Sequence, residues 1–286
     1  MIELVVDPRR RDLGGFEVAR LLPSAARRMV GPFIFLDRMG PARFAPGIPR
    51  SVDVRPHPHI GLSTLTYLFE GEIMHRDSVG SEQAIRPGEV NWMTAGRGIT
   101  HSERFERARR EGGPMDGLQA WVALPEEHEE TAPGFWHHAQ ADLPALDEPR
   151  IARRLVAGEA HGERSPVRTH SPLFYIDSHL EAGARERLPG MYAERAAYVI
   201  DGEVAAGGRT FGAGRLLVFG PGDAVLEARA PARVMQLGGE PVGERFIEWN
   251  FVSSSRERIE QAKADWKAGR MKLPDLDDRE FIPLPS

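Results

Sequence analysis

Residues 55–61 of this chain read Arg-Pro-His-Pro-His-Ile-Gly, and residues 99–103 read Ile-Thr-His-Ser-Glu. Each stretch holds two polar side chains at i, i+2 spacing: His57 and His59 in the first, His101 and Glu103 in the second. On a β-strand this spacing places both side chains on one face of the sheet, where each pair can reach a common point. The two stretches therefore predict strands of a β-barrel with a metal site inside it.

Three imidazoles and one carboxylate form a nitrogen and oxygen donor set that suits iron, manganese, copper, nickel or zinc. A lone His-x-His is more often two histidines near a strand end without a ligand, so the segments between the pairs matter. These segments are a predicted strand over Ser63 to Phe69, a turn at Glu70-Gly71, a turn at Pro87-Gly88 and a predicted strand over Glu89 to Thr94. Antiparallel strands on either side of a barrel would bring the two pairs together, which is the cupin arrangement.

The composition is that of a globular protein, with 286 residues, 41% hydrophobic and 28% charged residues. This length allows two domains of ordinary size or one large all-β domain. The net charge of −5 provides no overall field that favours nucleic acid or an anionic membrane. The chain contains no cysteine, which excludes disulfides, zinc ribbons, iron–sulfur clusters and thiol nucleophiles.

The ends and the apolar runs of the sequence favour a cytoplasmic protein. The first residues, Met-Ile-Glu-Leu-Val-Val-Asp, do not have the pattern of a signal peptide. No apolar run approaches the roughly 18 to 20 residues that cross a bilayer. We therefore expect no membrane association and no direct binding of nucleic acid.

Two pairs of similar segments indicate an internal duplication. Tyr67-Leu-Phe-Glu-Gly-Glu-Ile73 matches Tyr198-Val-Ile-Asp-Gly-Glu-Val204, and Gly88-Glu-Val-Asn-Trp-Met93 parallels Gly214-Arg-Leu-Leu-Val-Phe219. The alternative is that strand–turn–strand units are alike in unrelated proteins. Two matches in the same order at nearly equal offsets favour the duplication, and so we predict an all-β fold of two tandem barrels.

The second copy lacks the four polar side chains. At the same two offsets, the positions of the first pair are taken by Leu188 and Gly190, and those of the second pair by Glu227 and Arg229. We therefore predict one metal ion, bound in the N-terminal half. The expected domains are a metal-binding barrel over residues 1–138 and a degenerate barrel over residues 139–286, with a linker near their junction.

One helix is expected, over residues of about 254–267 in the C-terminal domain. Ser254 and Glu257 form a capping-box pattern at its start. Ile259, Ala262 and Trp266 then fall on one face of the segment, as in an amphipathic helix. We expect this helix to pack on a barrel.

Several stretches resemble the signature of the pirin family. They are Gly31 to Asp37, Arg55 to Gly61, Tyr67 to Ile73, Asn91 to Glu103 and, near the end of the chain, Arg258 to Lys263. The similarity runs over nearly the whole chain, and the His-Pro-His and Thr-Ala-Gly-Arg-Gly motifs are its most specific part. The resemblance implies a bicupin with one non-haem iron in its N-terminal barrel.

The family's four metal ligands would fall on His57, His59, His101 and Glu103, and none of them is substituted. The implied cofactor is one divalent metal ion, Fe(II), although imidazole and carboxylate accept other transition metals. Four protein ligands on an octahedral metal leave two positions for water, O₂ or a substrate oxygen. Glu103 either stays a ligand or acts as a catalytic general base for a substrate hydroxyl.

The later histidines have no partner at ligand spacing; they are His128, His137, His138, His161, His170 and His179. His75 follows the turn at Glu70-Gly71 and either points towards the mouth of the pocket or lies on the surface. A surface position is the expectation for this residue.

Two functions from different classes fit the resemblance. The favoured one is a quercetin 2,3-dioxygenase type of enzyme, in which O₂ opens the ring of a flavonol or a similar enolisable substrate. The alternative is a regulatory protein that binds transcription factors or metabolic enzymes according to the oxidation state of its iron. In either case we expect a monomer.

Overall fold

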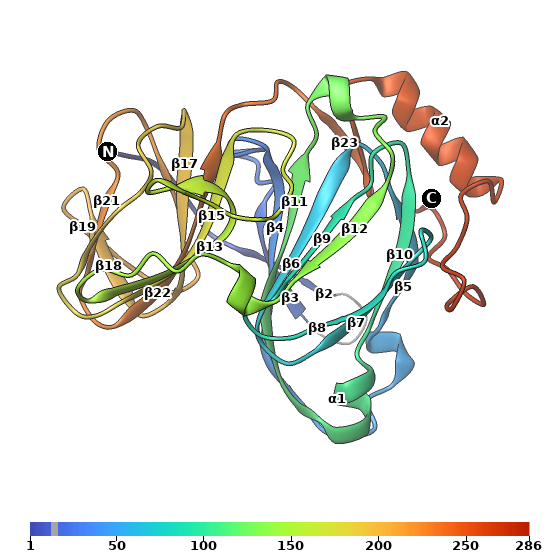
Figure 1. Cartoon of the computed structure of the whole chain (residues 1–286), viewed down its shortest axis with the longest axis horizontal. Helices are drawn as coiled ribbons and strands as arrows, with labels where there is room; N and C mark the ends of the chain where they lie inside the picture. Colours follow the sequence, from blue (N-terminus) through green and yellow to red (C-terminus); the bar gives the residue numbers. More distant parts are fainter. Residues whose placement is uncertain (13–16, 286) are drawn as a thin grey trace. The chain divides into compact units, whose positions relative to one another are not determined.

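The computed structural model describes residues 1–12 and 17–285, which form two compact units (Figure 1). The first-barrel unit consists of Arg10–Ala19, Leu36–Gln140 and Val242–Ser286. The second-barrel unit consists of Met1–Arg9, Arg20–Phe35 and Ala141–Pro241. The expected division into residues 1–138 and 139–286 thus resembles these units only in their central parts, because each end of the chain belongs to the unit built mainly from the other half.

Two antiparallel sheets contain the strands of the first barrel. In spatial order, the seven-stranded sheet contains β12 (Gly134–His138), β9 (Val90–Thr94), β6 (Leu62–Glu70), β11 (Gly113–Ala123), β4 (Phe33–Phe44), β3 (Glu17–Leu22) and β2 (Arg9–Asp12). The four-stranded sheet contains β5 (Val54–His59), β10 (Ile99–Arg104), β7 (Ile73–Asp77) and β8 (Glu82–Ile85). Leu68, Ile73, Ile85 and Phe105 are buried together in the core of this unit.

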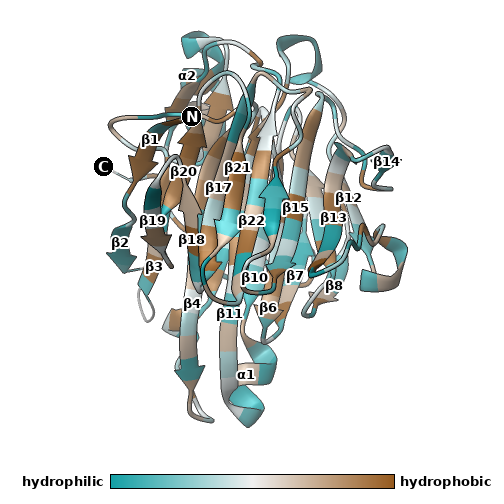
Figure 2. Cartoon of the chain, turned by 90° about the vertical axis from the view of Figure 1, so that its left-hand side faces the viewer, coloured by the Kyte–Doolittle hydropathy of each residue, from teal (hydrophilic) through white to brown (hydrophobic). Residues whose placement is uncertain are grey.

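Two further sheets contain the strands of the second barrel. In spatial order, the larger contains β1 (Ile2–Val6), β20 (Leu216–Phe219), β17 (Glu194–Asp201), β22 (Ala232–Gly239), β15 (Leu173–Leu180), β13 (Ile151–Ala160) and β14 (Glu163–Arg164). The smaller contains β16 (Arg185–Arg187), β21 (Val225–Ala228), β18 (Glu203–Ala206) and β19 (Arg209–Gly212). Figure 2 shows this unit with hydrophobic residues along β1 and β20, whereas β14 is hydrophilic.

The two barrels repeat the same strand order. The order β5-β10-β7-β8 in the first corresponds to β16-β21-β18-β19 in the second, and β9-β6-β11-β4 corresponds to β20-β17-β22-β15. Tyr67 on β6 and Tyr198 on β17 occupy equivalent strands, as the sequence match predicted. The all-β fold of two tandem cupin barrels is therefore confirmed.

The remaining elements are short. They are the helix α1 (Glu106–Glu111), the helix α2 (Arg256–Lys267), the 3-10 turns Arg50–Val52, Glu126–His128 and Gln140–Asp142, and the hairpin strands β23 (Phe246–Glu248) and β24 (Phe251–Ser253). Neither helix of the described residues is long and apolar enough to span a membrane.

Helix α2 confirms the predicted C-terminal helix, with a different cap. Ser255 is its N-cap residue, and the Oγ atom of Ser255 accepts a hydrogen bond from the N–H of Arg258. The expected cap, Ser254, instead donates its N–H to Glu129. The predicted apolar face, with Ile259 and Trp266, is buried in the first-barrel unit, so α2 packs there rather than in the unit that contains most of the later half.

Candidate metal centre

Strands β5 and β10 pair antiparallel and bring the two polar pairs together. His101 lies opposite His57 in this ladder, and Ile99 lies opposite His59. Because side chains alternate between the faces of a strand, all three histidines point to the same side of the sheet. The ladder shifts by one residue between His101 and Glu103, where a β-bulge interrupts the regular pairing.

His57, His59 and His101 form a compact buried group. One ring nitrogen of each residue lies within 4.8 Å of the others, and no more than 6% of any of these side chains is exposed. The ring centroids are 4.4 Å apart for His57 and His101, 4.9 Å for His57 and His59, and 5.1 Å for His59 and His101. Three imidazoles at this separation can coordinate one transition-metal ion.

Hydrogen bonds at Nδ1 select the nitrogen that each histidine offers to a metal. The Nδ1 atom of His57 lies 2.9 Å from the carbonyl oxygen of Arg55, and that of His59 lies 3.1 Å from the carbonyl oxygen of Asn250. A carbonyl oxygen only accepts, so each Nδ1 carries the proton and each Nε2 has a free lone pair. The residues fit a metal ion, because the Nε2 atoms of His59 and His101 are buried and have no hydrogen-bond partner among the described residues.

The three imidazoles are held in their neutral form. Burial lowers the pKa of His57 to about 4 and lowers the pKa values of His59 and His101 well below their usual range. Repulsion between the neighbouring imidazoles lowers these pKa values further. Neutral imidazole is the form that coordinates metals, so the group needs no deprotonation at neutral pH before a metal binds.

Glu103 is the predicted fourth ligand, but it is not a member of the three-histidine group. It follows the bulge on β10, where it lies opposite His75 of β7 and Val54 of β5. Its side chain is partly exposed, and burial raises its pKa to about 7. The role of Glu103 as a metal ligand therefore stays a prediction.

His75 is a residue that the sequence reasoning placed wrongly. It is buried, with 5% of its surface exposed, and its Nδ1 atom lies 3.4 Å from the Nδ1 atom of His101. Its ring stacks on Phe135 at a centroid distance of 4.4 Å, and its Nε2 atom lies 2.9 Å from Asp77. The sequence did contain an indication of its buried position. His75 and Asp77 have the same i, i+2 spacing as the other two polar pairs.

Asp77 contacts the Nε2 atom of His75, whose Nδ1 atom lies next to His101, and its carboxylate accepts the hydrogen bond from that Nε2 atom. Burial alone would raise its pKa, but hydrogen bonds from His75 and from the N–H of Ser81 outweigh burial and lower the pKa. The N–H of Val79 donates a further bond to the same carboxylate. Asp77 is therefore an ionised acceptor that orients His75.

The equivalent interior of the second barrel is built differently. Glu186 of β16 is fully buried and accepts hydrogen bonds from Arg153 and Gln236. Leu188 and Leu226 lie in the surrounding hydrophobic core. Among the described residues, the three histidines of the first barrel are the one group of side chains that can hold a metal.

The fold and this site define a class of protein: a bicupin whose first barrel contains a three-histidine centre able to hold a metal ion. The family models for pirin and for the pirin C-terminal cupin domain match residues 15–122 and 175–272. A pirin-like protein of Caulobacter vibrioides is 65% identical over 287 residues and covers 100% of both chains. The chain belongs to the pirin family.

Two crystal structures of proteins named quercetin 2,3-dioxygenase, both from Acinetobacter baumannii, are similar to this chain. The first has 33% sequence identity and a TM-score of 0.89, and the match covers 99% of this chain and 95% of that one. The second has 28% identity and a TM-score of 0.87, with coverage of 95% and 98%. Both similarities extend over the two barrels.

Proposed function

We propose that this protein is a metal-dependent dioxygenase of the quercetin 2,3-dioxygenase type, acting with O₂ on flavonols or similar enolisable compounds. The observation that supports this proposal best is the convergence of three neutral imidazoles whose Nδ1 atoms are already bonded, which leaves their Nε2 atoms for a metal. The choice of this reaction is supported by the similarity to a quercetin 2,3-dioxygenase structure at 33% sequence identity.

The proposed metal is Fe(II), held by His57, His59 and His101 with Glu103 as the fourth ligand. A metal with four protein ligands would supply two exchangeable positions and Lewis acidity towards an enolate oxygen. The carbonyl oxygens of Arg55 and Asn250 orient the proposed ligands. Each accepts a hydrogen bond from Nδ1 and so keeps the imidazole ring of His57 or His59 in one orientation.

Glu103 is the proposed general base. Burial raises the pKa of Glu103 to about 7 in the metal-free protein, so its carboxyl group can carry a proton near neutral pH. Once released from a metal, one of its Oε atoms can take the proton of a flavonol hydroxyl. A base of this kind is most effective when its pKa is close to the working pH. The same residue can act as a ligand and, after leaving the metal, as the base.

Aromatic side chains would keep water away from the substrate. Trp121 lies edge-on to His59 at a centroid distance of 5.0 Å, and Phe135 covers His75. Both rings provide apolar surface next to the imidazoles, which suits a flat aromatic substrate and strengthens the electrostatic interactions at the centre.

An aerobic assay tests this proposal. Protein loaded with Fe(II) should consume quercetin and O₂ in equal amounts and release carbon monoxide. The His59→Ala variant removes one imidazole and should lose this activity, whereas His161→Gln changes an exposed histidine of the second-barrel unit and should retain it. Loss of quercetin at the same rate in the wild type and in His59→Ala would contradict the proposal.

A further inference from the structure

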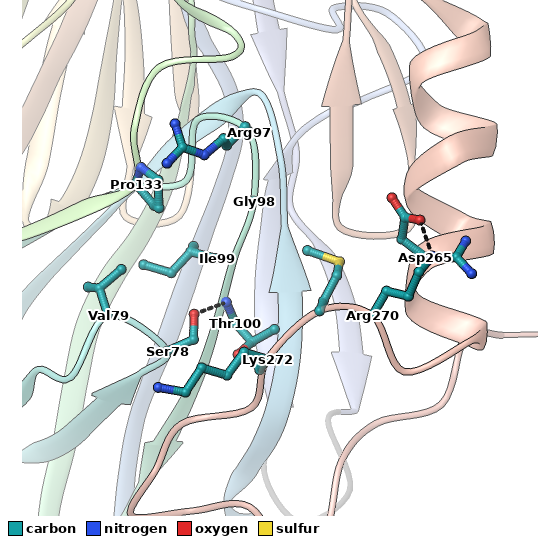
Figure 3. A pocket seen from close by; sticks show the side chains of 11 residues that line it. Ser78, Val79, Arg97, Gly98, Ile99, Thr100, Pro133, Asp265, Arg270 and Lys272 are labelled. Carbon is teal, nitrogen blue, oxygen red and sulfur yellow. Dashed lines mark hydrogen bonds and ion pairs between the residues drawn. The ribbon is translucent and has the colours of Figure 1, made fainter.

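A pocket lies in the first-barrel unit, outside the three-histidine centre. It has a volume of about 480 Å³, which is within the size range of small-molecule sites. Its lining comes from the loop after β7 with Ser78 and Val79, and from the turn before β10 and the first residues of that strand, Arg97 to Thr100 (Figure 3). Pro133, Asp265 of α2 and the residues after α2, Arg270 to Lys272, complete it.

The pocket is cationic although the chain has a net charge of −5. Arg97, Arg270 and Lys272 contribute three positive charges to its lining, and Asp265 contributes one carboxylate. Arg270 donates to Asp265 at 2.7 Å, so one cation is neutralised within the pocket. Lys272 forms an ion pair at 2.8 Å with Asp275. Asp275 itself does not line the pocket.

Arg97 is the cation without such a partner. Its side chain is exposed, and no hydrogen bond or ion pair to its guanidinium occurs in the part of the chain that the structure describes. Its backbone is held on both sides, because its N–H donates to Thr131 and its carbonyl oxygen accepts from the guanidinium of Arg258. Gly96 adds rigidity, since a Cβ atom there would lie 2.1 Å from the carbonyl oxygen of Thr131.

A rigid turn therefore presents a free guanidinium to the pocket. Arginine binds a carboxylate with two parallel hydrogen bonds, and a fixed backbone reduces the entropy lost on binding. An unpaired guanidinium on a fixed turn is therefore suited to bind an anion at this pocket.

The rest of the lining combines an apolar wall with a hydroxyl. Ile99 is buried, and 46% of Val79 is exposed. Together with Pro133 they offer apolar surface to a ligand. The Oγ atom of Ser78 accepts the N–H of Thr100, which leaves the hydroxyl proton of Ser78 free to donate.

We propose that this pocket binds a small organic carboxylate with an apolar body, such as an aryl carboxylate. The guanidinium of Arg97 binds the carboxylate, and Val79, Ile99 and Pro133 contact the apolar part. The hydroxyl of Ser78 lies on the other side of Ile99 from Arg97 (Figure 3). The site is separate from the metal centre, and it requires neither a bound metal nor the dioxygenase reaction. Its residues nevertheless adjoin the centre, because Ser78 follows Asp77 and Thr100 precedes His101.

Titration calorimetry of the full chain with benzoate tests the proposal. We expect saturable binding that weakens by about tenfold or more in Arg97→Gln, because a hydrogen-bonded charge pair contributes about that factor. Arg168→Gln is the matched control, since Arg168 is an exposed arginine of the second-barrel unit that does not line the pocket, and it should leave the affinity unchanged.

Two further ligands and one further variant make the result specific. Benzyl alcohol lacks the charge and should not bind, and inorganic phosphate lacks the apolar body and should bind more weakly than benzoate. Binding must persist in His59→Ala, because benzoate could otherwise coordinate the metal. Absence of saturable benzoate binding, equal affinity in Arg97→Gln, loss of binding in His59→Ala, or phosphate binding as tight as benzoate would each overturn the proposal.

Discussion

The Nδ1 atoms of His75 and His101 lie 3.4 Å apart in the buried interior of the first barrel. Only one of these atoms can carry the proton of a hydrogen bond between them. If His101 donates, its Nε2 atom is free for a metal, and His75 can donate from its own Nε2 atom to Asp77 at 2.9 Å. One assignment of protons therefore satisfies all three side chains, and it makes His75 a positioning residue for His101.

Replacing His75 tests this arrangement. His75→Leu removes the acceptor for His101 and should lower metal affinity about 10- to 100-fold, as is typical for residues that orient a ligand. His75→Gln keeps a side-chain oxygen that can accept the bond and should recover part of the affinity. Titration with Co(II), followed by its ligand-field absorption, measures both effects. Equal affinity and an unchanged spectrum in His75→Leu would show that His75 does not orient the ligand.

Metal binding should stabilise the protein through the three histidines. A ligand at about one hundred times its dissociation constant stabilises the native state by about 3 kcal/mol. We expect a chelator to lower the free energy of unfolding of the wild type by about this amount, as measured by urea denaturation. In His59→Ala the chelator should have almost no effect. The same loss of stability in that variant would place the metal elsewhere.

The pH dependence of metal affinity should report on Glu103. The pKa of His57 is about 4, and burial lowers the pKa values of His59 and His101 well below their usual range, so all three imidazoles are neutral at neutral pH. Glu103 has a pKa of about 7, so below that pH a metal must displace its proton. Affinity should therefore rise about tenfold per pH unit up to about pH 7 and then level off.

Glu103→Gln is the control for this pH dependence. The amide does not titrate, and so the affinity of this variant should change little between about pH 5.5 and pH 7. A slope in the variant as steep as that in the wild type would exclude Glu103 as the proton-releasing ligand. A flat wild-type profile would exclude it as well.

Asp177 should stabilise the second-barrel unit and lose its effect in acid. It is buried and receives two hydrogen bonds from Arg233, at 2.9 and 2.5 Å. Burial would raise its pKa, but the bonds from Arg233 outweigh burial and lower the pKa to about 2. The corresponding stabilisation of about 2 kcal/mol is complete above the unfolded-state pKa of about 4 and disappears as the pH falls through about 2.

The comparison with Asp177→Asn makes this measurable. The difference in free energy of unfolding between the wild type and the variant should be about half as large at about pH 3 as at about pH 6. Asp223→Asn, which changes an exposed carboxylate paired with Arg187, should show a much smaller difference at either pH. A difference for Asp177→Asn that does not change with pH would contradict the assignment.

The grouping of the three histidines could be predicted because strand periodicity is local. His57 and His59 point to one face of β5 as a consequence of their spacing alone, and the repeated strand–turn–strand motif indicated two barrels. Glu103 could not be placed in the same way, because the bulge after His101 shifts the register and leaves no mark in the sequence pattern.

The contacts that the sequence did not predict are long-range or depend on strand pairing. The carbonyl oxygen of Asn250, 191 residues from His59, orients the ring of His59, and it comes from a segment expected in the other domain. His75 was expected on the surface, although Asp77 stands two positions further on. Neither contact follows from local propensity, since each depends on how distant strands pair.

Labelling with ¹⁸O₂ tests the proposed reaction most directly. Fe(II)-loaded protein should convert quercetin to a ring-opened product that contains two ¹⁸O atoms from one O₂ molecule, as measured by mass spectrometry, and His59→Ala should form none of it. A product with one ¹⁸O atom or none, or an equal yield in His59→Ala, would contradict a dioxygenase centred on the three histidines.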